Sequence, residues 1–103
     1  MKLIIKNRIT ESNIQAEFYF SCKMNNINCY LEYKINQCRF DAVIYNNEKE
    51  ILAIIEVKSY TTNKEPKRNT KQIKKYSEFA LPIFMISRLD QIESIINEIK
   101  KLL

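Results

Sequence analysis

Histidine and glycine are both absent from this chain of 103 residues, and each absence excludes a class of function. Without histidine there is no Ser-His-Asp triad, no Cys-His nucleophile and no histidine-rich metal site. Any chemistry must therefore use carboxylates, lysine and a metal ion. Without glycine there is no glycine-rich phosphate loop, and positions with positive φ must fall to asparagine, which tolerates them best after glycine. The asparagines in expected turns are Asn25, Asn26, Asn36, Asn46 and Asn47.

The chain also lacks long apolar runs, and its cysteines are odd in number. No stretch approaches the roughly 20 apolar residues of a membrane span, and the opening Met-Lys-Leu-Ile-Ile-Lys is too short for a secretory signal. The three cysteines, Cys22, Cys29 and Cys38, cannot all pair and have no CxxC spacing. We expect reduced thiols in a soluble, intracellular protein of the cytoplasm, with no membrane partner.

The charge of the chain is positive. It has 17 basic and 12 acidic residues, which give a formal net charge of +5. A positive balance favours an anionic partner, with nucleic acid first and an anionic membrane surface second. At 103 residues and 46% hydrophobic content, we expect one domain built around a single core.

The stretch 39–58 is typical of a β-hairpin. Two apolar runs rich in β-branched residues flank a polar turn, which is the usual pattern of paired antiparallel strands. With the turn centred between Glu48 and Lys49, Asp41 lies directly opposite Glu56, and directly opposite residues point to the same face. A slip of one residue would put the two carboxylates on opposite faces, so the prediction depends on this register.

The two carboxylates need compensation, because negative charges held about 5 Å apart repel each other. A hard divalent cation bound through oxygen compensates them best. Lys58 follows Glu56 by two residues and shares its face, where a lysine can orient a water or stabilise developing negative charge. The pattern predicts a metal site at Asp41 and Glu56 with Lys58 beside it.

Thr10 is predicted to cap a helix over 11–24. Its apolar stripe consists of Ile14, Phe18 and Cys22. Glu11 and Gln15 lie one turn apart on the flank of that stripe. The alternative for Glu11 is a favourable interaction with the helix dipole, which needs no active site. Glu17 is the competing candidate for an acid that faces the site.

A second acid on the preceding strand is a further candidate. If the turn at 36–37 has two residues, Glu32 lies opposite Asp41 and could be a third carboxylate near the metal. The alternative is that Glu32 is a cross-strand partner of Arg39 or Lys34.

The rest of the chain completes an α/β pattern. The run 51–57 is apolar on both faces, as in a central strand with helices above and below. A strand over 82–87, joined to it through a helix over 70–80, should be parallel to it. Asp90 with Glu93 predicts the start of a last helix whose apolar period continues to the final residue. The expected order is helix 11–24, strands 29–35, 40–45 and 51–57, helix 70–80, strand 82–87 and a last helix.

The polar loop 61–69 and the helix after it are rich in basic residues. Such a run is usually a solvated face. Here it directly follows the acidic pair, and a metal site that acts on phosphodiesters needs nearby cations to hold the phosphate backbone. The predicted phosphate contacts are Lys64, Lys67, Arg68 and Lys71.

This order of elements resembles the PD-(D/E)XK nuclease superfamily, especially its small virus-type replication-repair (VRR-NUC-like) members, over nearly the whole chain. Asp41, in Arg-Phe-Asp, looks like the metal-binding aspartate of those enzymes, although phenylalanine at position 40 replaces their proline. Glu56-Val57-Lys58 looks like their E-x-K element. Glu11 with Gln15 looks like their acidic first helix.

A second element of the resemblance lies further along the chain. Gln72 and Tyr76 look like the QxxxY element of RecB-type relatives and would position the scissile strand. The resemblance implies a restriction-endonuclease-like αβββαβ(α) core with a mixed four-stranded sheet. It also implies that Mg²⁺ or Mn²⁺ binds to Asp41, Glu56 and the main-chain carbonyl of Val57. The other implied roles are for Lys58 to orient the attacking water and for Glu11 to hold a metal-bound water or a second ion.

The implied activity is hydrolysis of DNA phosphodiester bonds by an endonuclease, with RNA left open. A bare catalytic domain has no room for a sequence-reading module, which favours branched or structured DNA as substrate and a homodimer as the acting form. Two alternatives stay open. One is a catalytically silent nucleic-acid-binding domain on the same scaffold, and the other is a partner-binding α/β domain.

Overall fold

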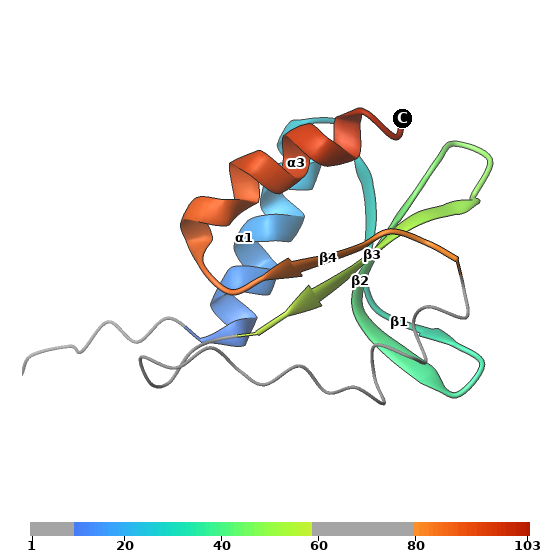
Figure 1. The fold of residues 1–103 in the computed structure, drawn as a ribbon, viewed down its shortest axis with the longest axis horizontal. Coiled ribbons are helices and arrows are strands. Elements are labelled where there is room, and N and C mark those ends of the chain that lie inside the picture. The colour runs from blue at the N-terminus through green and yellow to red at the C-terminus, as the bar shows by residue number, and fades with distance from the viewer. Residues whose placement is uncertain (1–9, 59–79) are drawn as a thin grey trace, which may run out of the picture.

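A computed structural model describes residues 10–58 and 80–103. The elements in chain order are α1 (Glu11–Met24), β1 (Asn28–Ile35), β2 (Cys38–Tyr45), β3 (Ile51–Val57), β4 (Ile83–Ile86), the 3-10 turn η1 (Leu89–Gln91) and α3 (Ile92–Lys100) (Figure 1). The strands form one four-stranded sheet in the order β1-β2-β3-β4. The first three are antiparallel, and β4 is parallel to β3. The predicted α/β class and mixed sheet are confirmed, whereas the helix predicted over 70–80 lies almost wholly outside the described residues.

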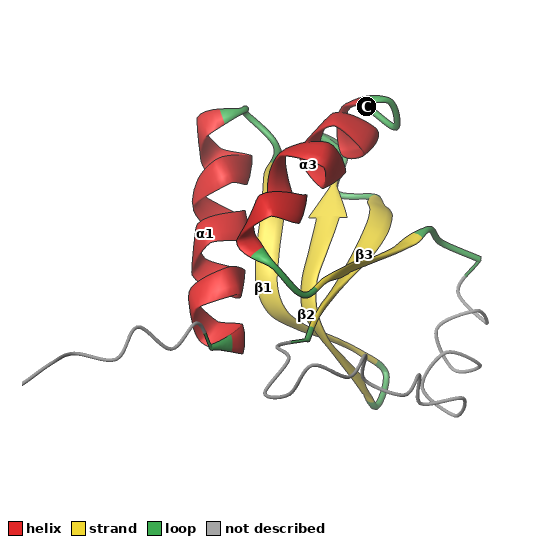
Figure 2. Ribbon diagram, turned by 60° about the vertical axis from the view of Figure 1, so that its left-hand side comes forward, coloured by secondary structure: helices red, strands yellow, loops and turns green. Residues whose placement is uncertain are grey.

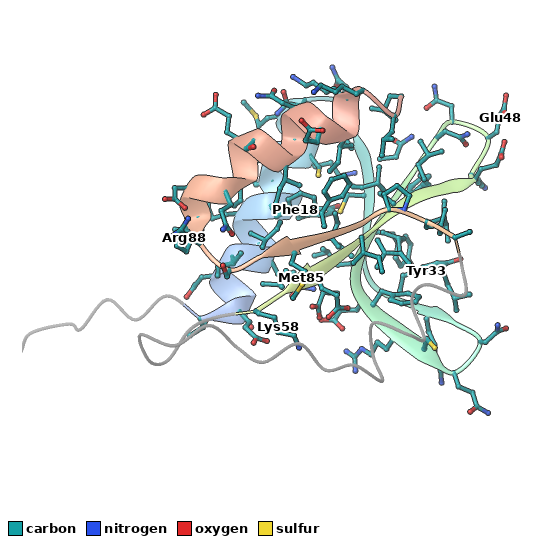
Figure 3. All side chains as sticks on the ribbon, in the orientation of Figure 1. Phe18, Tyr33, Glu48, Lys58, Met85 and Arg88 are labelled. Carbon is teal, nitrogen blue, oxygen red and sulfur yellow. The ribbon has the colours of Figure 1, made fainter. Side chains whose placement is uncertain are left out.

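The first helix begins where its cap predicts. The main-chain amide of Asn13 donates to Thr10 Oγ1 at 3.3 Å, and the amide of Thr10 donates back to Asn13 Oδ1 at 3.0 Å. This reciprocal cap satisfies two amides that lack partners within the helix. The predicted stripe of Ile14, Phe18 and Cys22 is at most 1% exposed. Figure 3 shows Phe18 between α1 and the strands.

The helices α1 and α3 lie on the same face of the sheet (Figure 2). Between them and the sheet is the main core cluster, which includes Phe18, Ala53, Ile55, Ile96 and Ile99. The opposite face has a smaller cluster of buried residues, Phe40, Val43 and Ile54. The strand β3 therefore contributes to both faces, as its apolar run predicts. Helices were expected on both faces; α1 and α3 lie on one of them, and the helix predicted over 70–80 lies almost wholly outside the described residues. Within residues 10–58 and 80–103, no helix is long and apolar enough to cross a membrane.

The three cysteines are free thiols, as expected. Cys22 and Cys29 are both buried in the main core cluster. A hydrogen bond with Cys29, followed by burial, raises the pKa of the Cys22 thiol. A thiol held in this way stays protonated and unreactive.

The hairpin of β2 and β3 has the predicted register at its end nearest to Asp41. Ala42 pairs with Ile55, as the prediction requires. The turn is centred slightly earlier than predicted, since Tyr45 pairs with Ile51. Leu52 is an extra residue in β3, and the resulting bulge restores the predicted pairing beyond it.

Asparagine occupies the positive-φ position in only some of the turns. Asn26 and Asn36 have φ values of 56° and 55°, as expected. In the turn between β2 and β3, however, Lys49 has the positive φ of 65°. The side-chain oxygen of Asn46 accepts hydrogen bonds of 2.9 Å from two main-chain amides of that turn. The expectation that only asparagine takes such positions is therefore wrong, because this turn uses its asparagine as a side-chain cap.

The last helix starts and ends differently from the prediction. Gln91 Oε1 accepts hydrogen bonds of 2.8 and 3.2 Å from the main-chain amides of the two residues after β4. Asp90 forms an ion pair with Arg88 at 3.2 Å in place of the predicted helix-starting box. The helix ends at Lys100, and the leucines at 102–103 are 40% and 56% exposed. The expectation of helix to the last residue is wrong, because these leucines do not reach the core.

Candidate active site

The candidate site lies where β2 stops pairing with β3. Main-chain pairing between these strands ends at Ala42 and Ile55. One step beyond this last pair, the same register would bring Asp41 opposite Glu56. The observed pairs from Ala42 with Ile55 to Ile44 with Ala53 have the predicted register, and Asp41 and Glu56 themselves lie just beyond the last of these pairs.

At this point the side chain of Asp41 accepts the hydrogen bond that a main-chain carbonyl of β2 would accept in a regular sheet. The amides of Ile54 and Lys58 donate to carbonyls of β4 and the residues around it at 2.9 and 2.8 Å. Since amides alternate in direction along a strand, the amide of Val57 points toward β2. It donates to Asp41 Oδ2 at 2.7 Å. The carboxylate of Asp41 is thus fixed against the end of β3.

Glu56 is deeply buried. It is 5% exposed, and among the described residues it is the one polar or charged side chain in the buried class. Burying a carboxylate is costly without a compensating partner. Glu56 is therefore an acid at the end of an otherwise apolar core strand, a position where charged residues are rare.

The charges around Asp41 come from the predicted site residues. Burial raises the pKa of Asp41, and the hydrogen bond from Val57 partly offsets this rise. The negative charges of Glu32 and Glu11 raise the pKa further, whereas the positive charge of Lys58 lowers it. The fold therefore gathers three predicted charged residues, from α1, β1 and the end of β3, around one carboxylate.

Three other candidate residues, Lys58, Glu11 and Glu17, lie on α1 or just after β3. Lys58 is half-buried and directly follows β3 (Figure 3). Glu11 is exposed in that first turn. Glu17, the competing candidate, is exposed, lines a hollow between α1 and α3, and is not among the charges that act on Asp41.

Gln15 connects the first helix to both strands of the site. Its Nε2 donates to Glu32 Oε1 at 3.1 Å and to the main-chain carbonyl of Asp41 at 2.8 Å. Arg39 Nε donates to Glu32 Oε2 at 2.7 Å, and Arg39 Nη2 lies 2.6 Å from the same oxygen. The hydrogen bond from Gln15, with that from Arg39, lowers the pKa of Glu32. Glu32 is therefore held as a charged carboxylate.

Both interpretations of Glu32 find support in these contacts. It is the cross-strand partner of Arg39, and its charge also acts on Asp41. In the part of the chain that the structure describes, no three acidic or cysteine side chains form a group that could hold a metal ion. A metal at Asp41 and Glu56 would therefore need main-chain, water or substrate oxygens to complete its ligands.

Sequence reasoning missed two contacts of the site. The bond from the Val57 amide to Asp41 has no sequence signal, because it depends on where β2 leaves β3. The bond from Gln15 to the Asp41 carbonyl had one weak signal, the spacing of Gln15 one turn after Glu11. The predicted nucleic-acid contacts that lie outside the described residues are Lys64, Lys67, Arg68, Lys71, Gln72 and Tyr76.

The fold and the site together define an α/β domain with a restriction-endonuclease-like core. The chain matches the family model of the type I restriction enzyme R protein N terminus (HSDR_N) over residues 4–100, and it belongs to this family. It is thus a restriction-enzyme-related domain, which gives it a DNA-related nuclease role at a coarse level. Searches of the curated proteins and of the solved structures each gave no significant match. The narrower VRR-NUC-like assignment stays a prediction.

Proposed function

We propose that this domain is a metal-dependent nuclease of the PD-(D/E)XK type that hydrolyses phosphodiester bonds of DNA as an endonuclease. The observation that supports the proposal is the hydrogen bond of the Asp41 carboxylate to the amide of Val57, the residue between the buried Glu56 and Lys58. Membership of a restriction-enzyme family supports DNA as the substrate. The positive net charge of +5 supports an anionic substrate of this kind.

The donor atoms fit Mg²⁺ or Mn²⁺. Asp41, Glu56 and the main-chain carbonyl of Val57 offer hard oxygen ligands, and Mg²⁺ is usually held by one or two carboxylates with waters and substrate oxygens. A two-carboxylate site is therefore sufficient. When bound, the metal would lower the pKa of a water and neutralise charge on the phosphate.

The other residues act on the water and on the substrate. Lys58 supplies a positive charge that orients the attacking water or stabilises the pentacovalent phosphorus. Glu11, at the start of α1, would hold a water beside the metal or a second ion. Gln72, Tyr76 and the basic residues of 64–71 position the strand to be cut.

The test is cleavage of labelled plasmid, linear, single-stranded and four-way-junction DNA, and of RNA, in Mg²⁺, Mn²⁺ or EDTA. The variants are Lys58→Ala and, as a matched control, Lys100→Ala in the last turn of α3. We expect metal-dependent cleavage by the wild type and by the control. Lys58→Ala should bind the same substrates without cutting them.

Two other outcomes favour the alternatives. Binding without cleavage on every substrate would indicate a catalytically silent nucleic-acid-binding domain, whereas neither binding nor cleavage would indicate a partner-binding α/β domain. Preference for the four-way junction over linear duplex would support action on branched DNA. Light scattering of the purified protein, with and without DNA, tests the homodimer.

A further inference from the structure

Glu32 has an unusual backbone for its place in the fold. Its φ is 54°, in the middle of β1. The other non-glycine residues with positive φ in the described ranges lie outside the strands. A residue with a Cβ atom occupies this conformation rarely, and keeps it only where surrounding contacts hold it.

In both β1 and β2, the face of the sheet to which alternate side chains point changes at this position. Leu31 and Ala42 pair with each other and belong to the cluster under the helices. Tyr33 and Phe40 pair in the same register, yet they belong to the cluster on the opposite face. In a regular strand, residues two apart point to the same face. The two residues between these pairs, where the hairpin bends, are Glu32 and Asp41.

The bend creates the contact that fixes Asp41. Figure 2 shows β1 and β2 curving away from α1 toward their turn. Because β2 leaves β3 beyond Ala42, the amide of Val57 meets the side chain of Asp41 rather than a main-chain carbonyl. The geometry of the bend therefore determines where this carboxylate lies.

The side chain of Glu32 is held from two sides of the bend. Gln15 donates to it from α1 at 3.1 Å while also holding the main-chain carbonyl of Asp41 at 2.8 Å. Arg39 donates to it at 2.7 Å from the part of β2 beyond the bend. These contacts join the helix and both arms of the hairpin at one carboxylate.

We propose that Glu32 is a positioning residue: its contacts with Gln15 and Arg39 stabilise the bend that sets the carboxylate of Asp41 on the amide of Val57. The catalytic consequence rests on the proposed nuclease function, but the structural part does not. Glu32 need not touch metal or substrate to act in this way.

The first readout is hydrogen exchange of single main-chain amides by NMR, in EDTA. Glu32→Ala removes both contacts and should raise the exchange rate of the Val57 amide at least about tenfold, the scale of one lost hydrogen bond. The amide of Ala53, in the same strand but away from the bend, should keep its rate. Glu32→Gln should retain most of the protection, because its side-chain carbonyl still accepts from Gln15. Glu48→Ala, in the turn at the far end of the hairpin from Lys58 (Figure 3), is the control.

A second variant keeps the test decisive if Glu32→Ala does not fold. Gln15→Ala removes the donor to both Glu32 and Asp41 from a half-buried position on α1, and it should raise the Val57 exchange rate in the same selective way. Unchanged Val57 exchange in a folded Glu32→Ala or Gln15→Ala variant would overturn the proposal. So would an equal rise at Val57 and Ala53, which reports general destabilisation.

The second readout is cleavage, on the substrate that the wild type cuts. Glu32→Ala should lower kcat about tenfold or more and leave KM unchanged, since the residue positions Asp41 without binding substrate. Glu32→Gln should restore most of the rate. If the wild type cuts no substrate, the nuclease function fails, whereas the exchange result still decides the role of Glu32.

Discussion

The main-chain amide of Val57 donates a 2.7 Å hydrogen bond to the Oδ2 of Asp41, which joins two strands at the point where their own ladder ends. The carboxylate of Asp41 therefore has a structural role in addition to the proposed one in metal binding. Substitutions that differ only in hydrogen-bonding capacity can separate the two roles.

Asp41→Asn and Asp41→Ala should differ in stability but not in activity. The asparagine keeps an oxygen that accepts from Val57, whereas alanine leaves a part-buried amide without its acceptor. We expect Asp41→Ala to lower the free energy of unfolding by about 1–3 kcal/mol relative to Asp41→Asn. Urea unfolding in EDTA measures the difference, and both variants should lose cleavage. Equal stability of the two would show that this hydrogen bond contributes nothing net.

The stability of the metal-free protein should depend on the ionisation of Asp41. Its pKa is raised in the folded state, chiefly by burial, so the folded protein binds this proton more tightly than the unfolded chain does. The stabilisation is complete below the ordinary pKa of aspartate and is lost as the pH rises through the raised value. Urea unfolding in EDTA between about pH 3 and 7 should show the wild type losing stability relative to Asp41→Asn as the pH rises. A constant difference between them would contradict this expectation.

Mg²⁺ or Mn²⁺ should raise the Tm of the wild type in a concentration-dependent way. A ligand that binds only the folded state at about 100 times its Kd adds about 2.7 kcal/mol of stability. Glu56→Gln and Asp41→Asn should lose this response, and Glu48→Gln, in the distant turn, should keep it. Thermal unfolding with increasing metal measures the effect. The same response in all four proteins would assign it to nonspecific binding.

Two phenylalanines of the first helix should respond differently to truncation. Phe18 is fully buried in the main core cluster, and Phe20 is 62% exposed. Phe18→Ala should lower the free energy of unfolding by about 3–5 kcal/mol, through lost burial and the cavity left behind. Phe20→Ala should change it by less than about 0.5 kcal/mol. Urea unfolding of both variants checks the packing of α1, and a large loss at Phe20 would place that side chain in an interface.

The helix and strand pattern could be predicted from the sequence because local signals dominate it. Thr10 marks the start of α1, and the stripe through Phe18 gives its buried face. The pairing of Ala42 with Ile55, on which the predicted opposition of Asp41 and Glu56 depends, follows from a turn centre that is slightly wrong, and the bulge at Leu52 corrects the register. A bulge of this kind has no signal in a strand that is apolar on both faces.

The bend at Glu32 could not be predicted from the sequence. Glutamate has no preference for positive φ, so nothing local distinguishes this position from its neighbours on the strand. Its side chain is held by Gln15 from α1 and by Arg39 from β2, both of which are elements other than its own strand. Sequence reasoning could name Glu32 and Gln15 as candidates, but only the fold shows that they are in contact.

The bend at Glu32 also affects how this sheet meets other molecules. In the described part of the chain, β1 lies at an open edge of the sheet, with β4, only four residues long, at the other. A long regular edge strand is a template on which a foreign strand can add, and proteins commonly interrupt it with proline or a charged side chain. Here a charged residue with a left-handed backbone breaks the edge at Glu32. The feature that orients Asp41 therefore also discourages aggregation through β1.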